Sequence, residues 1–359
     1  MAKLCGARLR VLKIGLCALA LSTLGFAQHY TQTDLVTDAK DPNLQNPWGL
    51  VASSGGPWWV SDENDGLSTL YDGAGHIQSL VVKVPSGSGK GTGHPTGIMF
   101  NGKSTDFLLS PGNPAFFIYV TLDGTVSGWN PGVSASSAVI KVNNSSKGAV
   151  YTGATIGEIG ENEMIYVANF HTGKVEVYNS SFKPVTLSKN AFIDATIPQD
   201  FAPFNIQGIG PNLYVTYAKQ NSTKTFPVDG AGLGFVDVYS PQGTLLQRLQ
   251  HGSWLNAPWG VVLAPADFGE FSHALLVGDF LGTGTIAAYN SVNGQFLGNM
   301  LTPKGALVEI PGLWTLTFGH GNSSSGAADS LYFTAGGGPT GLLGTLKPIS
   351  TELNEDDEQ

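Results

Sequence analysis

Apolar residues along the chain fall into short runs that are separated by turns rich in Gly, Pro, Asn and Asp. The runs either alternate apolar with small or polar residues or stay apolar throughout, which is typical of β-strands in sheets packed face to face. Pairs such as Asp72-Gly73, Asp123-Gly124 and Asn293-Gly294 lie between runs, where tight hairpins need a positive φ. The pattern predicts an all-β chain of short strands joined by hairpins.

The same pattern repeats at intervals of roughly fifty residues, a period typical of propellers and other repeat folds. Each unit opens with an apolar run punctuated by Pro or Gly, followed by a second run, a third with an aromatic residue near its end and, in most units, a fourth. Four-stranded units repeated in this way predict a six-bladed β-propeller. The six openings are NPWGLVA from Asn46, HPTGIMF from His94, VYTGATI from Val150, FNIQGIG from Phe204, APWGVVL from Ala257 and GLWTLTF from Gly312.

The two ends of the repeat array predict how the ring closes. The segment Tyr30–Val36 (YTQTDLV) has strand character but precedes the first unit, whereas the last unit lacks an obvious fourth strand. We therefore expect Tyr30–Val36 to complete the last blade, because closure removes both open sheet edges.

Residues 1–27 have the features of a signal peptide that is cleaved near Ala27. A basic stretch precedes an apolar run from Ile14 to Phe26, which is too short to remain as a membrane anchor. We expect a secreted protein, periplasmic or extracellular, with no transmembrane segment in the mature chain and a propeller domain at 28–346. Both cysteines, Cys5 and Cys17, lie in the leader, so no disulfide is expected. Residues 347–359 predict an acidic disordered tail.

Composition narrows the classes of partner. With 42% hydrophobic and 13% charged residues and a net charge of −9, the chain is neither disordered nor basic enough for a typical nucleic-acid binder. The string Gly97–Ser104 fits a phosphate-binding loop, but its middle continues an apolar strand and Pro111 follows, so no nucleotide is expected. We expect a monomer whose partner is an envelope glycan or protein.

Long strings of the chain resemble a bacterial family of exported proteins of unknown function, some members of which carry PEP-CTERM sorting tails. The resemblance covers about Tyr30 to Leu346, and this chain ends in LNEDDEQ without the apolar anchor of the tailed members. The family is similar to NHL- and TolB-like propellers and, distantly, to the calcium-dependent lactonase and phosphotriesterase superfamily. The strings are DPNLQNPWGL (41–50), FAPFNIQGIG (201–210), LYVTYAKQ (213–220), GFVDVYSPQGTLLQRL (234–249) and LNAPWGVVLAPADFGEFSHALLVGDF (255–280).

Equivalent positions of the repeat define a candidate site at one mouth of the central channel. Carboxylate and amide oxygens that converge from several blades are ligands suited to calcium, and the distant lactonase resemblance implies an ion of this kind. The candidate metal ligands are Asp62, Asn169, Asn205 and Asp279. Asp and Asn at strand ends also cap turns with their own side chains, which is the competing interpretation.

The remaining candidate ligand-binding residues at this mouth are Asn46, Trp48, His94, Trp259 and Trp314. Clustered indoles could stack on sugar rings, although a repeated Trp also serves as core between blades. The sequence therefore supports two hypotheses: a non-catalytic binding or interaction module, and a calcium-dependent hydrolase of esters or lactones with the metal in the channel.

Overall fold

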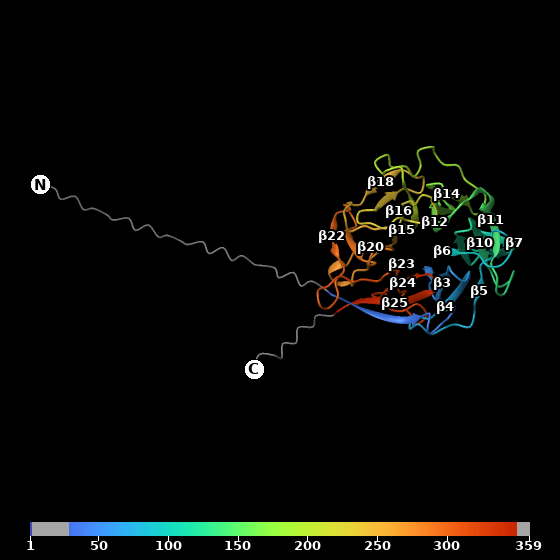
Figure 1. Ribbon diagram of the computed structural model, residues 1–359, viewed down its shortest axis with the longest axis horizontal. Coiled ribbons are helices and arrows are strands. Elements are labelled where there is room, and N and C mark those ends of the chain that lie inside the picture. The colour runs from blue at the N-terminus through green and yellow to red at the C-terminus, as the bar shows by residue number, and fades with distance from the viewer. Residues whose placement is uncertain (2–28, 350–359) are drawn as a thin grey trace.

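The computed structural model describes residue 1 and residues 29–349, and these form a ring of β-sheets around a central axis (Figure 1). Two short 3-10 helices, η1 (Ser145–Lys147) and η2 (Gly269–Phe271), accompany the strands, and the described residues contain no α-helix. The prediction of an all-β, six-bladed propeller is confirmed.

Each blade is an antiparallel sheet, and the first strands of successive blades contact one another around the axis. Blade 2 also carries a small hairpin of β7 (Leu108–Ser110) and β8 (Asn113–Pro114). The strands are as follows: blade 1, β2 (Pro47–Val51), β3 (Trp58–Asp62), β4 (Leu67–Tyr71) and β5 (Val82–Lys83); blade 2, β6 (Pro95–Phe100), β9 (Phe117–Thr121), β10 (Thr125–Trp129) and β11 (Val139–Asn143); blade 3, β12 (Tyr151–Ile159), β13 (Asn162–Asn169) and β14 (Lys174–Asn179); blade 4, β15 (Phe201–Ile209), β16 (Asn212–Lys219), β17 (Gly234–Tyr239) and β18 (Leu245–Arg248); blade 5, β19 (Pro258–Leu263), β20 (Ala274–Asp279), β21 (Ile286–Asn290) and β22 (Phe296–Asn299); blade 6, β23 (Leu313–Phe318), β24 (Leu331–Gly337), β25 (Thr340–Pro348) and β1 (Tyr30–Thr37).

The N-terminal strand closes the ring as the sequence predicts. In Figure 1 the blue β1 lies along the red β25, and the two pair antiparallel from Tyr30–Pro348 to Thr37–Leu342. Tyr30 is 1% exposed, and its hydroxyl donates to the carbonyl of Phe268 in blade 5 at 3.1 Å. The strand therefore joins both the last blade and its neighbour.

A glycine in the middle of several inner strands lets neighbouring blades approach closely. A Cβ on Gly49 would lie 2.6 Å from the carbonyl oxygen of Thr96, and one on Gly97 would lie 2.7 Å from the amide nitrogen of Ala154. Because such distances are too short for a side chain, these positions need glycine. Gly97 thus belongs to strand β6. The close packing of blades 2 and 3 explains the glycine at this position of the string Gly97–Ser104, which matches a phosphate-binding loop in sequence only.

The predicted signal peptide at 1–27 and the end of the predicted tail, 350–359, lie outside the described residues. The last strand ends at Pro348, close to the expected domain boundary at Leu346. Between residues 29 and 349, no helix has the length and hydrophobicity needed to cross a membrane.

Candidate functional site at the two ends of the channel

The mouth at which the inner strands begin is filled by aromatic side chains. The indoles of Trp48 and Trp314 stack with ring centroids 3.5 Å apart, and Phe280 stacks on the other side of Trp314 at 3.7 Å. Trp259 meets Trp48 edge to face at 6.2 Å, and Phe204 packs against the same group. This aromatic plug joins blades 1, 4, 5 and 6 across the axis.

The plug contains all three tryptophans that were candidates for stacking on a sugar. Trp48, Trp259 and Trp314 are 2%, 4% and 0% exposed, so each ring face is covered by a neighbouring side chain. A sugar could stack here only after a ring moved aside. Carbohydrate binding by these residues stays a prediction, and the structure shows in addition that they form core between blades.

Beside the plug, hydrogen bonds connect three of the candidate ligand-binding residues through Glu63. Asn46 donates from Nδ2 to Glu63 Oε2 at 2.6 Å, and the other carboxylate oxygen lies 2.8 Å from His94 Nδ1. Trp314 donates from Nε1 to Asn46 Oδ1 at 3.1 Å. Glu63 is not among the predicted site residues, because it follows Asp62 in an acidic turn and its position carries no signal of its own.

This polar network leaves one nitrogen of His94 facing outward. The hydrogen bond with Glu63 raises the pKa of His94, and burial opposes that shift only in part. His94 is about half exposed (49% of its side chain), and its Nε2 makes no hydrogen bond within the described residues. Asn46 reaches Glu63 from a backbone with φ of +47°, a conformation sparsely populated by residues other than glycine.

Three of the four predicted metal ligands accept hydrogen bonds close to their own strand ends. Asp62 Oδ2 accepts from the backbone and hydroxyl of Thr69, and Asp279 accepts from the backbone of Asn256. Asn169 accepts from the backbone amide of Val150 at the start of its own blade. Asn205 instead donates across to the neighbouring inner strand, to the carbonyl of Trp259.

Within residues 29–349, no group of three or more His, Cys, Asp or Glu side chains is placed to hold a metal ion. Burial raises the pKa of Asp62 and of Asp279 well above the usual range, which favours their neutral forms. Asp62 Oδ1 is nevertheless buried with no hydrogen-bond partner. Calcium binding by the four predicted ligands stays a prediction, and this oxygen of Asp62 is a ligand atom without a competing hydrogen bond.

The opposite end of the channel contains a cavity of about 490 Å³. It is lined by the second halves of all six inner strands, and no lining residue carries a charge. The lining residues are Leu50, Val51, Ala52, Ile98, Met99, Phe100, Ala154, Thr155, Ile156, Gln207, Gly208, Ile209, Val261, Val262, Leu263, Thr315, Leu316 and Thr317.

Polar groups in this cavity are few. The hydroxyl of Thr315 donates to the carbonyl of Trp48, and the hydroxyl of Thr155 accepts from the amide of Gly208. The side chains of Gln207 and Thr317 have no hydrogen bond within the described part of the chain, so they can face a ligand. Phe100 and Leu263, which are 37% and 42% exposed, extend the apolar surface.

The repeat positions predict a site at the other mouth and do not predict this cavity. A signal was present, because the inner strands of blades 1, 2 and 5 stay apolar to their last residue, as in GLV, IMF and VVL. Exposed apolar strand ends around an axis indicate either a partner or a ligand.

The fold and its channel define a six-bladed β-propeller with one filled and one hollow end. No family model matches the chain. It is 31% identical over 283 residues to the uncharacterized protein L690 of Acanthamoeba polyphaga mimivirus, with 76% of this chain and 73% of that protein covered. Protein R648 of the same virus is 30% identical, with 76% and 68% covered. The chain belongs to the family of these viral proteins.

A third relative, the uncharacterized protein R640 of the same virus, is 30% identical over 293 residues. The chain spans about half of its length, 52%, so R640 has a large part without a counterpart in the aligned region. The predicted bacterial family with PEP-CTERM tails stays a prediction, because these relatives are viral.

Solved structures share the fold at low sequence identity. A protein of unknown function from Bacteroides thetaiotaomicron has a TM-score of 0.55 at 12% identity, covering 89% of this chain and 76% of that one. The soluble aldose sugar dehydrogenase from Escherichia coli has a TM-score of 0.52 at 13% identity, covering 89% and 100%. Virginiamycin B lyase from Staphylococcus aureus has a TM-score of 0.51 at 11% identity, covering 90% and 100%. At these identities the likeness shows the propeller fold alone.

Proposed function

We propose that this propeller is a non-catalytic binding module that takes an uncharged, largely apolar ligand in the axial cavity. The observation that carries the proposal is the lining itself: six inner strands surround about 490 Å³ without one charged side chain. Ligand pockets are typically about 300–1,000 Å³, mostly apolar, with a few polar groups that orient the ligand. Gln207 and Thr317 supply such groups here.

The chemistry of the lining supports binding without catalysis. The cavity has no His, Asp, Glu, Lys, Cys or Ser side chain, so it offers neither a general base nor an activated nucleophile. Its walls are strands of a closed ring, which hold the site in place before a ligand arrives. Because residues 1–27 predict export, we propose that the ligand is met outside the cytoplasm and is an apolar part of an envelope protein, since an envelope glycan is too polar for this lining.

The neutral, apolar dye N-phenyl-1-naphthylamine tests this function, because its fluorescence rises in apolar sites. We expect saturable binding that Leu263→Glu weakens at least tenfold, because an apolar ligand bound there would remove water from the new carboxylate. The matched control is Leu245→Glu, which changes a similarly exposed leucine on the outer strand β18. No saturation, or an equal effect of the two variants, would contradict the proposal.

A calcium-dependent hydrolase at the filled mouth is a second candidate. It is favoured by the buried, unpartnered Oδ1 of Asp62 and by the outward Nε2 of His94 on the same face. The test compares melting temperature and hydrolysis of p-nitrophenyl acetate in calcium and in EDTA. A calcium-dependent rise in both that Asp62→Asn abolishes would support it, and identical values in calcium and EDTA would overturn it.

A further inference from the structure

Blade 3 differs from the other five blades because it has no fourth strand to cover its third. β14 is the edge of a three-stranded sheet, and the next segment pairs with it at one bridge, Tyr178–Pro184. There, the amide of Val185 donates to the carbonyl of Val177. The backbone N–H and C=O groups of successive residues point to opposite edges of a strand. Those of Val175, two residues before Val177, therefore point to the same edge as those of Val177. Within the described residues, no backbone hydrogen bond reaches Val175 from that side.

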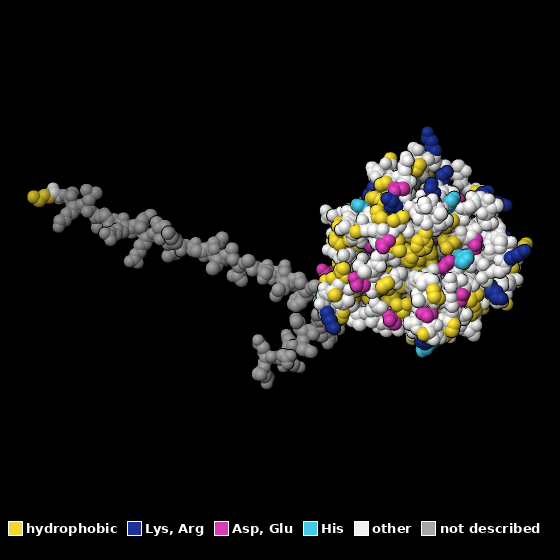
Figure 2. Space-filling view, in the orientation of Figure 1, with side chains coloured by type: hydrophobic (Ala, Val, Ile, Leu, Met, Phe, Trp, Pro, Cys, Tyr) yellow, Lys and Arg dark blue, Asp and Glu magenta, His cyan; other side chains and the backbone are white. Residues whose placement is uncertain are grey.

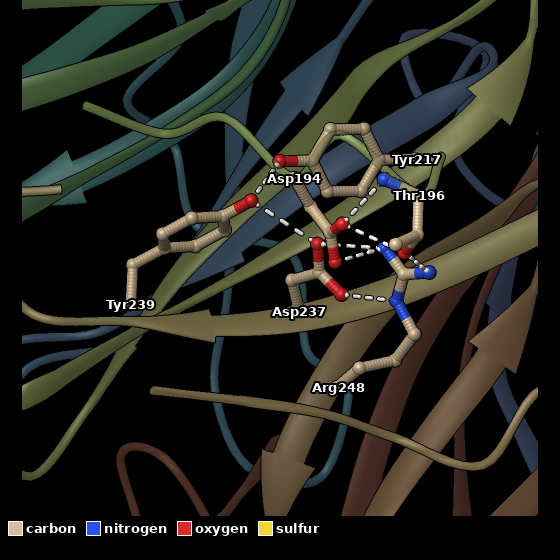
Figure 3. A network of polar contacts seen from close by, with 6 residues as sticks. All are labelled: Asp194, Thr196, Tyr217, Asp237, Tyr239 and Arg248. Atoms are coloured by element: carbon tan, nitrogen blue, oxygen red, sulfur yellow. Dashed lines mark hydrogen bonds and ion pairs between the residues drawn. The ribbon is translucent and has the colours of Figure 1, made fainter. Parts of the chain in front are cut away.

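After Val185 the chain turns away and leaves a groove of about 930 Å³ along this edge. The lining residues run from the end of β11 through β14 to the loop that precedes blade 4. In blade 4, β18 occupies the equivalent place, and its Arg248 pairs with Asp237 of β17 (Figure 3). Blade 3 has an open groove where blade 4 has a strand.

The groove is basic although the whole chain carries a net charge of −9. Five lysines line it against a single acidic residue, Glu176, and Figure 2 shows Lys and Arg side chains around the upper rim, where Figure 1 places β14. Among residues 29–349, none of these lysines forms an ion pair. The five are Lys141, Lys147, Lys174, Lys183 and Lys189.

Two of the five lysines have partners inside the protein. Lys141 donates to the carbonyl of Leu109 at 3.2 Å, and Lys147 donates to Asn144 Oδ1 at 3.0 Å. The side-chain ammonium groups of the exposed Lys174, Lys183 and Lys189 have no hydrogen bond within the described part of the chain. These three are positioned to meet an external anion.

We propose that the β14 edge binds an extended acidic peptide from a partner protein, which adds a strand to blade 3. The open backbone groups at Val175 provide main-chain hydrogen bonds, and the lysines provide charge-assisted bonds to carboxylates. Lysines on an edge strand also repel the same edge of a second copy. The groove therefore selects an acidic strand and rejects self-pairing.

The test measures fluorescence anisotropy of a fluorescein-labelled, ten-residue peptide of alternating Glu and Val with the whole chain. We expect saturable binding that weakens at least tenfold with the double variant Lys174→Glu/Lys183→Glu. The matched control is Lys90→Glu/Lys304→Glu, which makes the same change in net charge at exposed lysines outside the groove. Melting curves of both variants verify folding.

Two further peptides separate strand addition from simple charge attraction. A version with Gln in place of Glu and a version with three Val residues changed to Pro should each bind at least tenfold more weakly. Equal binding of the Pro version, or an equal loss with the control variant, would mean charge alone and would overturn the proposal. Binding only after deletion of residues 350–359 would make the occupant this chain's own acidic C-terminus, which also overturns it.

Discussion

Blades 3 and 4 hold a carboxyl group at the same position of the third strand in two different ways. Both carry an acidic residue two positions before a tyrosine on the third strand: Glu176 and Tyr178 in β14, and Asp237 and Tyr239 in β17. The pairs are equivalent in register, because Glu176 lies opposite Val167 and Asp237 opposite Val215 on the second strands. One blade has a fourth strand beside this acid and the other does not.

In blade 4 a cation neutralises the acid. Arg248 donates from Nε to Asp237 Oδ1 at 2.8 Å and reaches Asp194 with its Nη2 (Figure 3). The Nη1 of the same guanidinium donates to the hydroxyl of Thr196 at 2.7 Å. Asp194 and Thr196 lie in the loop that enters the blade, so the arginine joins strand β18 to the preceding connection.

In blade 3 neutral donors replace the cation. Glu176 Oε2 accepts from the hydroxyls of Tyr151 at 2.7 Å and Tyr178 at 2.6 Å, and Asn169 donates to Oε1 at 2.7 Å. A carboxylate with three such bonds has no need of an arginine from a fourth strand. Glu176 therefore keeps its hydrogen bonds without a fourth strand, which permits an open edge in blade 3.

Removal of the Arg248 guanidinium from blade 4 should have the largest effect on the free energy of unfolding. We expect Arg248→Met to lower the free energy of unfolding by about 3 kcal/mol, because one buried and one largely buried carboxylate lose their partner. Chemical denaturation at pH 7 measures the change. Lys183→Met, at the open edge of blade 3, should change it by less than about 0.5 kcal/mol. Similar losses for the two variants would remove the distinction between the blades.

The part of this comparison that the sequence could predict is the repeat itself. KVEVYN and FVDVYS align as third strands, and the unpaired Tyr30–Val36 reveals how the ring closes. The partner of Asp237 could not be read in the same way. Its pairing with Arg248 depends on a register shift between Val238 and Tyr239 that leaves no local sequence signal.

The candidate site shows the same limit. Repeat positions correctly bring Asn46, His94 and Trp314 to one mouth, because equivalent residues of a ring share a face. Whether that mouth is filled or hollow depends on how far each side chain reaches across the axis. Trp48 and Trp314 stack over the axis, and the cavity remains at the other end. The spacing of apolar residues predicts which face of a strand is buried, but it does not predict how far each side chain reaches across the channel axis.

A second prediction concerns pH and Asp194. Burial alone would raise the pKa of Asp194, but hydrogen bonds from Thr196 and the charge of Arg248 outweigh it and hold that pKa below its usual range. A depressed pKa in the folded state gives stability that is present above the unfolded-state pKa, about 3.9, and is lost as pH falls through the lower folded value. We expect Asp194→Asn to cost about 2 kcal/mol at pH 7.

That cost should shrink as the pH falls below about 4, because the wild-type carboxyl then becomes neutral too. Denaturation curves of both proteins between pH 7 and the lowest pH at which they fold measure the difference. Asp267→Asn changes an exposed acid outside the network and serves as the control. A difference that stays constant with pH would show that Asp194 acts through packing and not through its charge.

The smallest expected changes in the free energy of unfolding come from the two tyrosines that follow these acidic residues, Tyr239 in blade 4 and Tyr178 in blade 3. Tyr239 donates to Asp237 Oδ2 at 3.1 Å, and its hydroxyl lies 2.8 Å from that of Tyr217, which is 5% exposed. Tyr239→Phe leaves the buried Tyr217 hydroxyl without its only protein partner in the described residues. We therefore expect a loss of about 1 kcal/mol in the free energy of unfolding.

Tyr178→Phe should cost about half as much, because the remaining groups of blade 3 keep partners. Glu176 retains its bonds from Tyr151 and Asn169, and Asn144 still donates to the Tyr151 hydroxyl at 2.7 Å. Denaturation of both variants under one condition compares the two blades directly. If Tyr178→Phe were the more costly change, blade 3 would depend on its tyrosine as blade 4 depends on its arginine. The open edge would then need another source of support.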